Sequence, residues 1–135
     1  MVNELEADIR DEERSFFGEK MVDAAFNPKN VGELERPDGV GRGTTAEGFT
    51  LQLYIRIEDG RITDCTFVTD ARGPTIAFGS AVTELVKGKT VEEATEIDAE
   101  TIKSALGGVP EDEEHTPEIA LDALRAALED YRQRR

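Results

Sequence analysis

Apolar and polar residues alternate along residues 50–57, and this is the clearest pattern in the chain. A period of two is typical of a strand that is buried on one face. The apolar positions of this strand are Leu51, Leu53, Ile55 and Ile57. Asp59-Gly60 follows, a dipeptide that favours a two-residue hairpin, so residues 62–69 are predicted to return as the antiparallel partner strand. A further edge strand is expected around Val40, in a loop rich in glycine and charge.

Three stretches repeat their apolar residues at helical spacing instead. The first covers residues 16–26 and is stopped by Asn27-Pro28. The second begins directly after the turn at residues 70–73, and the third occupies residues 117–131 with Pro117 at the first helical position. Each of the three carries one apolar stripe, which predicts that it packs on a core.

Two shorter helices are predicted between the second and third stretches. Thr90 and Glu93 have the spacing of a capping box, and Asp98 can cap the next helix, which ends at Gly107-Gly108. The strands and helices together predict an α+β fold of two layers, with a small antiparallel sheet of about three strands and helices packed on one face. Residues 1–14 are expected to form an acidic, mobile N-terminal lead, and residues 15–135 one domain.

Charge excludes some classes of partner. The chain has 135 residues and a formal net charge of −14, so its field repels phosphate backbones and anionic lipid. Neither nucleic acid nor a membrane is therefore expected as a partner. No apolar run approaches the length of a spanning helix, and no basic region precedes an apolar one at the N-terminus, so the protein is expected in the cytoplasm.

Cysteine is scarce enough to limit the chemistry. Cys65 is the one cysteine of the chain, which excludes an internal disulfide and any site of several thiolates within a single chain. It falls inside the second predicted hairpin strand, where a cysteine is most often a small buried apolar residue. A role in sulfur relay would need an exposed, acidic thiol instead.

The stretch 67–94 resembles a known family. It is similar to the helix that carries the second cysteine of the NifU/IscU iron-sulfur cluster scaffolds, with the pattern F-x-T-x-G-C-G-x-A-I-A-x-S-S-x-x-T-E-L-x-x-G-K-T-x-x-E-A. The matching residues are Phe67, Thr69, Gly73, Ile76, Ala77, Ser80, Thr83, Glu84, Leu85, Gly88, Lys89, Thr90, Glu93 and Ala94. The resemblance extends over about residues 15–131, and it implies the fold of the IscU/NifU-like and SufE-like proteins.

The same resemblance places the family's three cluster-ligating cysteines at positions that are substituted here. Glu47 stands where the family's C-G-D loop begins and Phe49 replaces its aspartate, while Arg72 and Thr116 replace the second and third cysteines. The histidine of the family's H-C-S sequence is retained as His115. Since thiolates are the ligands of iron-sulfur clusters, a cluster held by one chain alone is not expected.

Two interpretations of the substituted pocket stay open. His115 and Glu47, with Asp70 nearby, offer a nitrogen and carboxylates to a divalent ion such as zinc or iron. Alternatively, Arg72 pairs with Glu47, so that a salt bridge replaces the metal as the link between loops. The second interpretation is the more economical, because an arginine in the pocket disfavours a cation.

The resemblance implies a non-classical accessory, regulatory or carrier protein of iron-sulfur cluster assembly. A cysteine desulfurase or another scaffold protein would be its partner, and the oligomeric state is left open. The alternative is a binding module outside that process, which uses the pocket for a small anionic ligand at Arg72 or for a divalent metal. An enzyme is not expected, because no Ser-His-Asp arrangement, phosphate loop or dinucleotide fingerprint is present.

Overall fold

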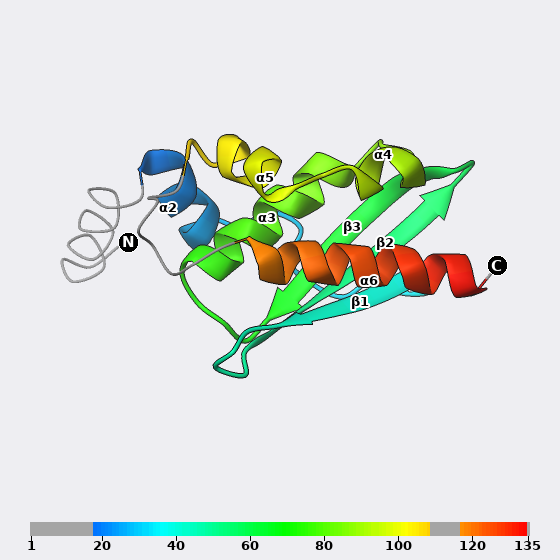
Figure 1. Cartoon of the computed structure of the whole chain (residues 1–135), viewed down its shortest axis with the longest axis horizontal. Coiled ribbons are helices and arrows are strands. Elements are labelled where there is room, and N and C mark those ends of the chain that lie inside the picture. Colours follow the sequence, from blue (N-terminus) through cyan, green and yellow to red (C-terminus); the bar gives the residue numbers. More distant parts are fainter. Residues whose placement is uncertain (1–17, 109–116, 135) are drawn as a thin grey trace.

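The computed structural model describes residues 18–108 and 117–134. Its helices and strands are α2 (Glu19–Phe26), β1 (Gly39–Thr44), β2 (Thr50–Glu58), β3 (Arg61–Thr69), α3 (Pro74–Val86), α4 (Val91–Thr95), α5 (Ala99–Ala105) and α6 (Glu118–Arg134). The strands form one antiparallel sheet in the order β1-β2-β3, and α3 and α6 cover the same face of it (Figure 1). The predicted two-layer α+β fold is confirmed. The predicted lead at residues 1–14 lies outside the described residues.

The hairpin between β2 and β3 forms at the predicted dipeptide. Asp59 and Gly60 both have positive φ, 51° and 78°, as the tight hairpin turn requires. Cys65 pairs with Ile55 and Phe67 with Leu53, so all four side chains face the helices. The register shifts next to Arg56, which lets Ile62 face the same side although its sequence parity is opposite to that of Cys65.

Three glycines of β1 bring α6 unusually close to the sheet. Gly39, Gly41 and Gly43 alternate along the strand, so they share one face. A Cβ atom at any of them would collide with the backbone of α6, at Ala127, Ala123 and Ile119 respectively. The absence of side chains on this face of β1 therefore allows the helix backbone to rest directly on the strand.

The turn after α2 is fixed to α3 by Asn30. This residue has a φ of 63°, and its amide nitrogen donates to Thr83 Oγ1 at 3.1 Å and to Glu84 Oε2 at 2.9 Å. Lys87 Nζ donates to the Asn30 side-chain oxygen at 2.6 Å, and Phe67 N donates to the Asn30 carbonyl at 3.0 Å. The turn thus ties α2 to both α3 and the outer edge of β3.

The remaining helices follow their predicted signals. Thr90 and Glu93 form the capping box of α4, and the Asp98 carboxylate accepts from Thr101 N at 2.9 Å at the start of α5. The predicted stripe of α6 is buried at Ile119, Ala123, Leu124, Ala127 and Leu128. No helix in residues 18–108 and 117–134 is long and apolar enough to cross a membrane.

Candidate functional site

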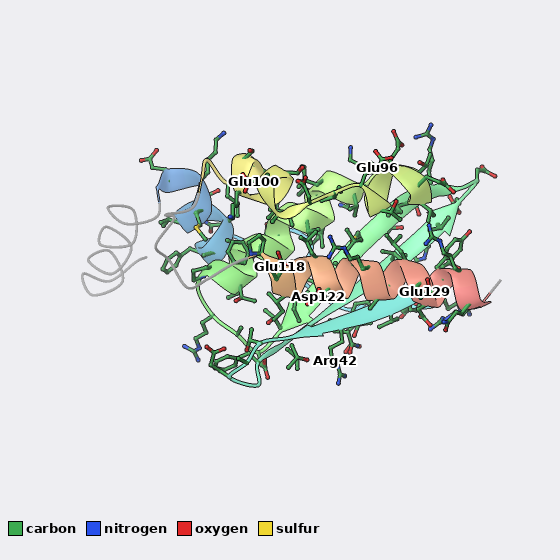
Figure 2. The ribbon with its side chains drawn as sticks, viewed as in Figure 1. Arg42, Glu96, Glu100, Glu118, Asp122 and Glu129 are labelled. Atoms are coloured by element: carbon green, nitrogen blue, oxygen red, sulfur yellow. The ribbon has the colours of Figure 1, made fainter. Side chains whose placement is uncertain are left out.

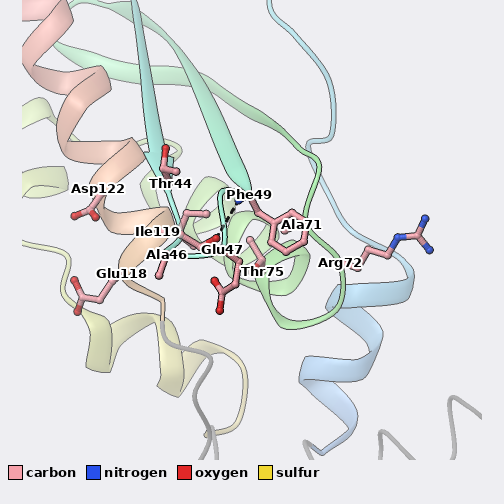
Figure 3. Close-up of a pocket in the computed structure, with 11 residues that line it drawn as sticks. Thr44, Ala46, Glu47, Phe49, Ala71, Arg72, Thr75, Glu118, Ile119 and Asp122 are labelled. Carbon is pink, nitrogen blue, oxygen red and sulfur yellow. Dashed lines mark hydrogen bonds between the residues drawn. The ribbon is translucent and has the colours of Figure 1, made fainter.

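A pocket of about 430 Å³ opens where the β1–β2 loop, the start of α3 and the first turns of α6 meet (Figure 3). One loop and the first turns of two helices, from three separate parts of the chain, therefore contribute to one hollow. Its lining residues are Thr44, Thr45, Ala46, Glu47, Phe49, Ala71, Arg72, Thr75, Glu118, Ile119 and Asp122.

The β1–β2 loop holds Glu47 at the pocket through hydrogen bonds made by Thr45. Thr45 N donates to the Phe49 carbonyl at 2.8 Å, and Phe49 N donates to Thr45 Oγ1 at 3.1 Å. Gly48, with a φ of 93°, donates its N–H to the Thr45 carbonyl at 3.0 Å. These bonds close the loop on itself and leave the side chains of Glu47 and Phe49 exposed.

The loop before α3 is held by Asp70. The Asp70 carboxylate accepts from Thr50 N at 2.8 Å, which joins the end of β3 to the start of β2. Thr69 Oγ1 donates to the Thr50 carbonyl at 2.5 Å and accepts from Ala71 N at 3.1 Å. The Asp70 carboxylate is therefore used to hold this loop in place. Asp70 does not line the pocket, so the expectation that it contributes to the pocket is wrong.

Glu47 and Arg72 line the same pocket, but the expected salt bridge between them does not form. Figure 3 shows the Arg72 side chain directed away from the hollow, and no ion pair joins it to Glu47. Two neighbouring loops thus bring these positions together without a direct bond.

The other two predicted site residues, His115 and Thr116, lie outside the described residues. Their involvement in a metal site stays a prediction. Within residues 18–108 and 117–134, no group of three or more His, Cys, Asp or Glu side chains has the arrangement to hold a metal ion. Glu47 therefore belongs to no group of three or more candidate metal ligands in this part of the chain.

Two acidic residues of the pocket were missed by the sequence analysis. Glu118 and Asp122 are exposed on the first turns of α6 and flank Ile119, which is buried. Their spacing of four residues places them on one side of the helix, next to the predicted core stripe. That position beside the stripe is the signal that could have identified them.

The hydroxyl of a buried threonine also lines the pocket. Thr75 sits in the first turn of α3 and is 6% exposed, and its side chain makes no hydrogen bond with any described residue. The Thr75 hydroxyl is not among the fully buried unpaired atoms of the described residues, so it reaches the pocket. It is therefore available to a group that enters the pocket.

Cys65 is remote from this chemistry. Its side chain is fully buried in the core, as predicted, and it lies on the helix-covered face of β3, which the sequence pattern left undecided. Burial raises the pKa of its thiol far above the usual range, because the thiolate would be desolvated. A sulfur relay through Cys65 is therefore excluded in the folded state.

The pocket as a whole favours positive charge. Its lining combines the carboxylates of Glu47, Glu118 and Asp122 with the apolar surface of Phe49 and Ile119. Arg72 is the single basic residue among the described residues of the lining, and its guanidinium is turned away. The expected alternative of a small anion held by Arg72 is thus opposed by the charge of the lining.

Comparison with known proteins gives consistent results. The model of the family described as "NifU-like N terminal domain" matches residues 16–135. A protein of Archaeoglobus fulgidus named iron-sulfur cluster assembly scaffold protein IscU 1 is 42% identical over 116 residues, which span 85% of this chain and 76% of that protein. A protein of Haemophilus influenzae named iron-sulfur cluster assembly scaffold protein IscU is 40% identical over 121 residues, which span 86% of this chain and 95% of that protein.

Solved structures agree in fold. A NifU-like protein (N-terminal) from Brucella abortus superposes with a TM-score of 0.57 at 20% identity, covering 85% of this chain and 91% of that one. A putative iron-sulfur cluster assembly scaffold protein for the SUF system from Fervidobacterium islandicum superposes with a TM-score of 0.59 at 16% identity. The match covers 89% of this chain and 96% of that one. At such identities the likeness concerns the arrangement of helices and strands.

Proposed function

This chain belongs to the NifU-like N-terminal domain family, and we propose that it acts in iron-sulfur cluster assembly as a non-classical member, an accessory or carrier protein rather than an enzyme. The observation that carries the proposal is the pocket shared by Glu47 and Arg72. The resemblance assigns cluster-ligating cysteines to these two positions, and they meet at one hollow of the same fold. The architecture of a scaffold is thus combined with side chains that do not bind iron through sulfur.

The residues at the pocket do not fit a cluster as cargo. Iron-sulfur clusters are held by thiolates, whereas the pocket offers carboxylates, hydroxyl groups and an aromatic ring. Cys65, the one cysteine of the sequence, is buried in the sheet. We therefore propose that the chain alone holds no cluster and that it acts through other assembly proteins, such as a cysteine desulfurase or a scaffold with its cysteines intact, in the cytoplasm.

The alternative function, a binding module for an anion or a divalent metal outside cluster assembly, receives less support. Three carboxylates in the lining oppose an anion, and the described residues contain no group of three or more His, Cys, Asp or Glu side chains that could hold a metal. Its metal-binding form depends on His115, which stays a candidate through the resemblance alone.

Quantitative affinity purification tests the proposal. The full chain, tagged and expressed at native level in its own cells, is expected to enrich a cysteine desulfurase or a second scaffold protein over a tagged, unrelated acidic protein of similar size. The control excludes capture by charge, since the chain carries a net charge of −14. Absence of assembly proteins together with a stoichiometric metal or small molecule would support the alternative instead.

A further inference from the structure

We propose that the pocket is the docking site for a basic segment of a partner polypeptide, which places a lysine or arginine side chain among Glu47, Glu118 and Asp122. The inference rests on the proposed function for the kind of partner, and it adds the chemistry by which that partner is recognised. It follows from the charge, the shape and the unpaired groups of the lining.

The carboxylates of the pocket are unengaged. Among the described residues, Glu47, Glu118 and Asp122 form no ion pair and no hydrogen bond through their side chains. Some acidic residues elsewhere are used within the fold, since Glu93 caps α4 and the Asp130 carboxylate accepts from Val40 N at 2.9 Å. Other exposed acids, such as Glu92 and Glu96, are also unpaired among the described residues, so what distinguishes the pocket is that three unpaired carboxylates line one hollow.

The arrangement of these carboxylates selects an extended cation over a metal ion. All three line one hollow, but Figure 3 shows the Glu118 and Asp122 carboxylates directed away from Glu47, and no group of three or more such side chains among the described residues could hold a metal. A guanidinium or ammonium group carries several N–H donors that can reach separated acceptors. Thr75 lines the same hollow, and its hydroxyl, which has no hydrogen-bond partner among the described residues, offers a further acceptor.

The apolar part of the lining fits the stem of such a side chain. Phe49 is 46% exposed at the pocket, and Ile119 lines it from α6. Lysine and arginine bury their methylene groups against apolar surface while the charged end reaches polar groups. An aromatic face also attracts the cation itself, so Phe49 supports binding in two ways.

The surroundings indicate a polypeptide rather than a free amine. A second hollow of about 380 Å³ is lined by Ala25, Phe26, Gly73 and Ile76 and shares Arg72 with the first. The two hollows adjoin at the Arg72 loop, so together they exceed the size of a single cation and accommodate several residues of a partner chain.

The test measures binding of a short fluorescein-labelled peptide of alternating leucine and lysine to the full chain by anisotropy. The site variant is Glu47→Gln/Glu118→Gln/Asp122→Asn. The control variant, Glu92→Gln/Glu96→Gln/Glu129→Gln, removes the same amount of negative charge outside the pocket. Figure 2 shows Glu96 and Glu129 well away from Glu118. The site variant is expected to weaken binding about tenfold or more, and the control variant less than about twofold.

Further measurements determine where the peptide binds and whether a small amine can take its place. Phe49→Ala, which leaves the charge unchanged, is expected to weaken binding several-fold, and amide NMR shifts are expected in residues 45–49 and 71–75. Equal losses in the two charge variants would overturn the inference, since binding would then follow the overall field. Competition by spermidine at the peptide's own concentration would overturn it in favour of a small amine. Either failure leaves the capture of assembly proteins, and hence the proposed function, untouched.

Discussion

Gly41 of β1 lies directly against the backbone of Ala123 in α6, so close that a methyl group on Gly41 would overlap the Ala123 carbonyl oxygen. Backbone atoms of a helix cannot rotate aside as a long side chain can. We predict that Gly41→Ala lowers the free energy of unfolding by about 3 kcal/mol, because α6 must lift from the sheet. Urea denaturation monitored by circular dichroism measures this.

The neighbouring Arg42 provides the control for that substitution. Its side chain is exposed and donates to the Gln52 side chain at 3.0 Å on the other face of β1. Arg42→Ala should change the free energy of unfolding by less than about 0.5 kcal/mol. Equal effects of the two substitutions would contradict the close contact between strand and helix.

Asn30 gives a second stability prediction. Asn30→Gly keeps the left-handed backbone accessible but removes the hydrogen bonds to Thr83, Glu84 and Lys87, and should cost about 1 to 2 kcal/mol. Asn30→Ala should cost about 1 kcal/mol more, since its Cβ disfavours a φ of 63°. A reversed order of the two variants in urea denaturation would contradict the role of the turn.

Asp130 predicts a pH dependence. Val40 N–H donates a hydrogen bond to the Asp130 carboxylate, and this bond holds the pKa of the carboxyl below its usual range. Arg134, whose Nη2 lies 2.8 Å from Asp130 Oδ2, lowers the pKa further. A carboxyl with a lowered folded-state pKa stabilises the protein fully above its unfolded-state value of about 3.9 and loses this contribution as the pH falls through the folded-state pKa.

The stability difference between wild type and Asp130→Asn should therefore be constant near neutral pH and shrink below about pH 4. Thermal denaturation at a series of pH values measures it. Asp122→Asn, on the same helix but without a hydrogen bond in the described residues, serves as the control. A difference that grew on acidification would show that the Val40 contact does not act as described.

Cys65 should resist alkylation in the folded protein. The thiol is buried and its pKa is raised, so the reactive thiolate is almost absent at pH 8. Iodoacetamide is expected to leave the native chain unmodified and to modify it stoichiometrically in urea, as read by mass spectrometry. Rapid modification under native conditions would mean that β3 opens locally.

Restoring thiols tests whether Glu47, Arg72 and Thr116 occupy the family's three cysteine positions. The variant Glu47→Cys/Arg72→Cys/Thr116→Cys is expected to gain visible absorption on anaerobic reconstitution with iron and sulfide, whereas the wild type is expected to gain none. A variant with cysteines at the scattered positions Arg42, Glu96 and Glu129 controls for nonspecific iron sulfide. Absorption in both variants, or in neither, would contradict the equivalence of the three positions.

Much of the fold could be predicted because its signals are local. The alternation of Leu51, Leu53 and Ile55, the hairpin at Asp59-Gly60 and the capping box at Thr90 each depend on a few adjacent residues. The orientation of Cys65 and Ile62 could not be decided, because a register shift inside the hairpin changes the parity of β3.

The candidate site was predictable in part, for a different reason. The resemblance identified Glu47 and Arg72, which line one pocket, but the direction of the Arg72 side chain depends on packing in three dimensions. Glu118 and Asp122 carry no motif, and only the contact between α6 and the β1–β2 loop gives them a role. The net charge of the pocket could not be predicted, because it depends on which residues the fold brings together.

The pairing of the turn after α2 with β3 bears on self-association. Asn30 and Gly32 exchange backbone hydrogen bonds with Phe67, and further along the same strand Ile62 does so with Gly88 and Lys89. Exposed strand edges are templates for intermolecular sheets and fibrils. With these backbone groups occupied, β3 is shielded from recruiting a foreign strand, so the protein should tolerate high concentration without forming amyloid-like aggregates through this side.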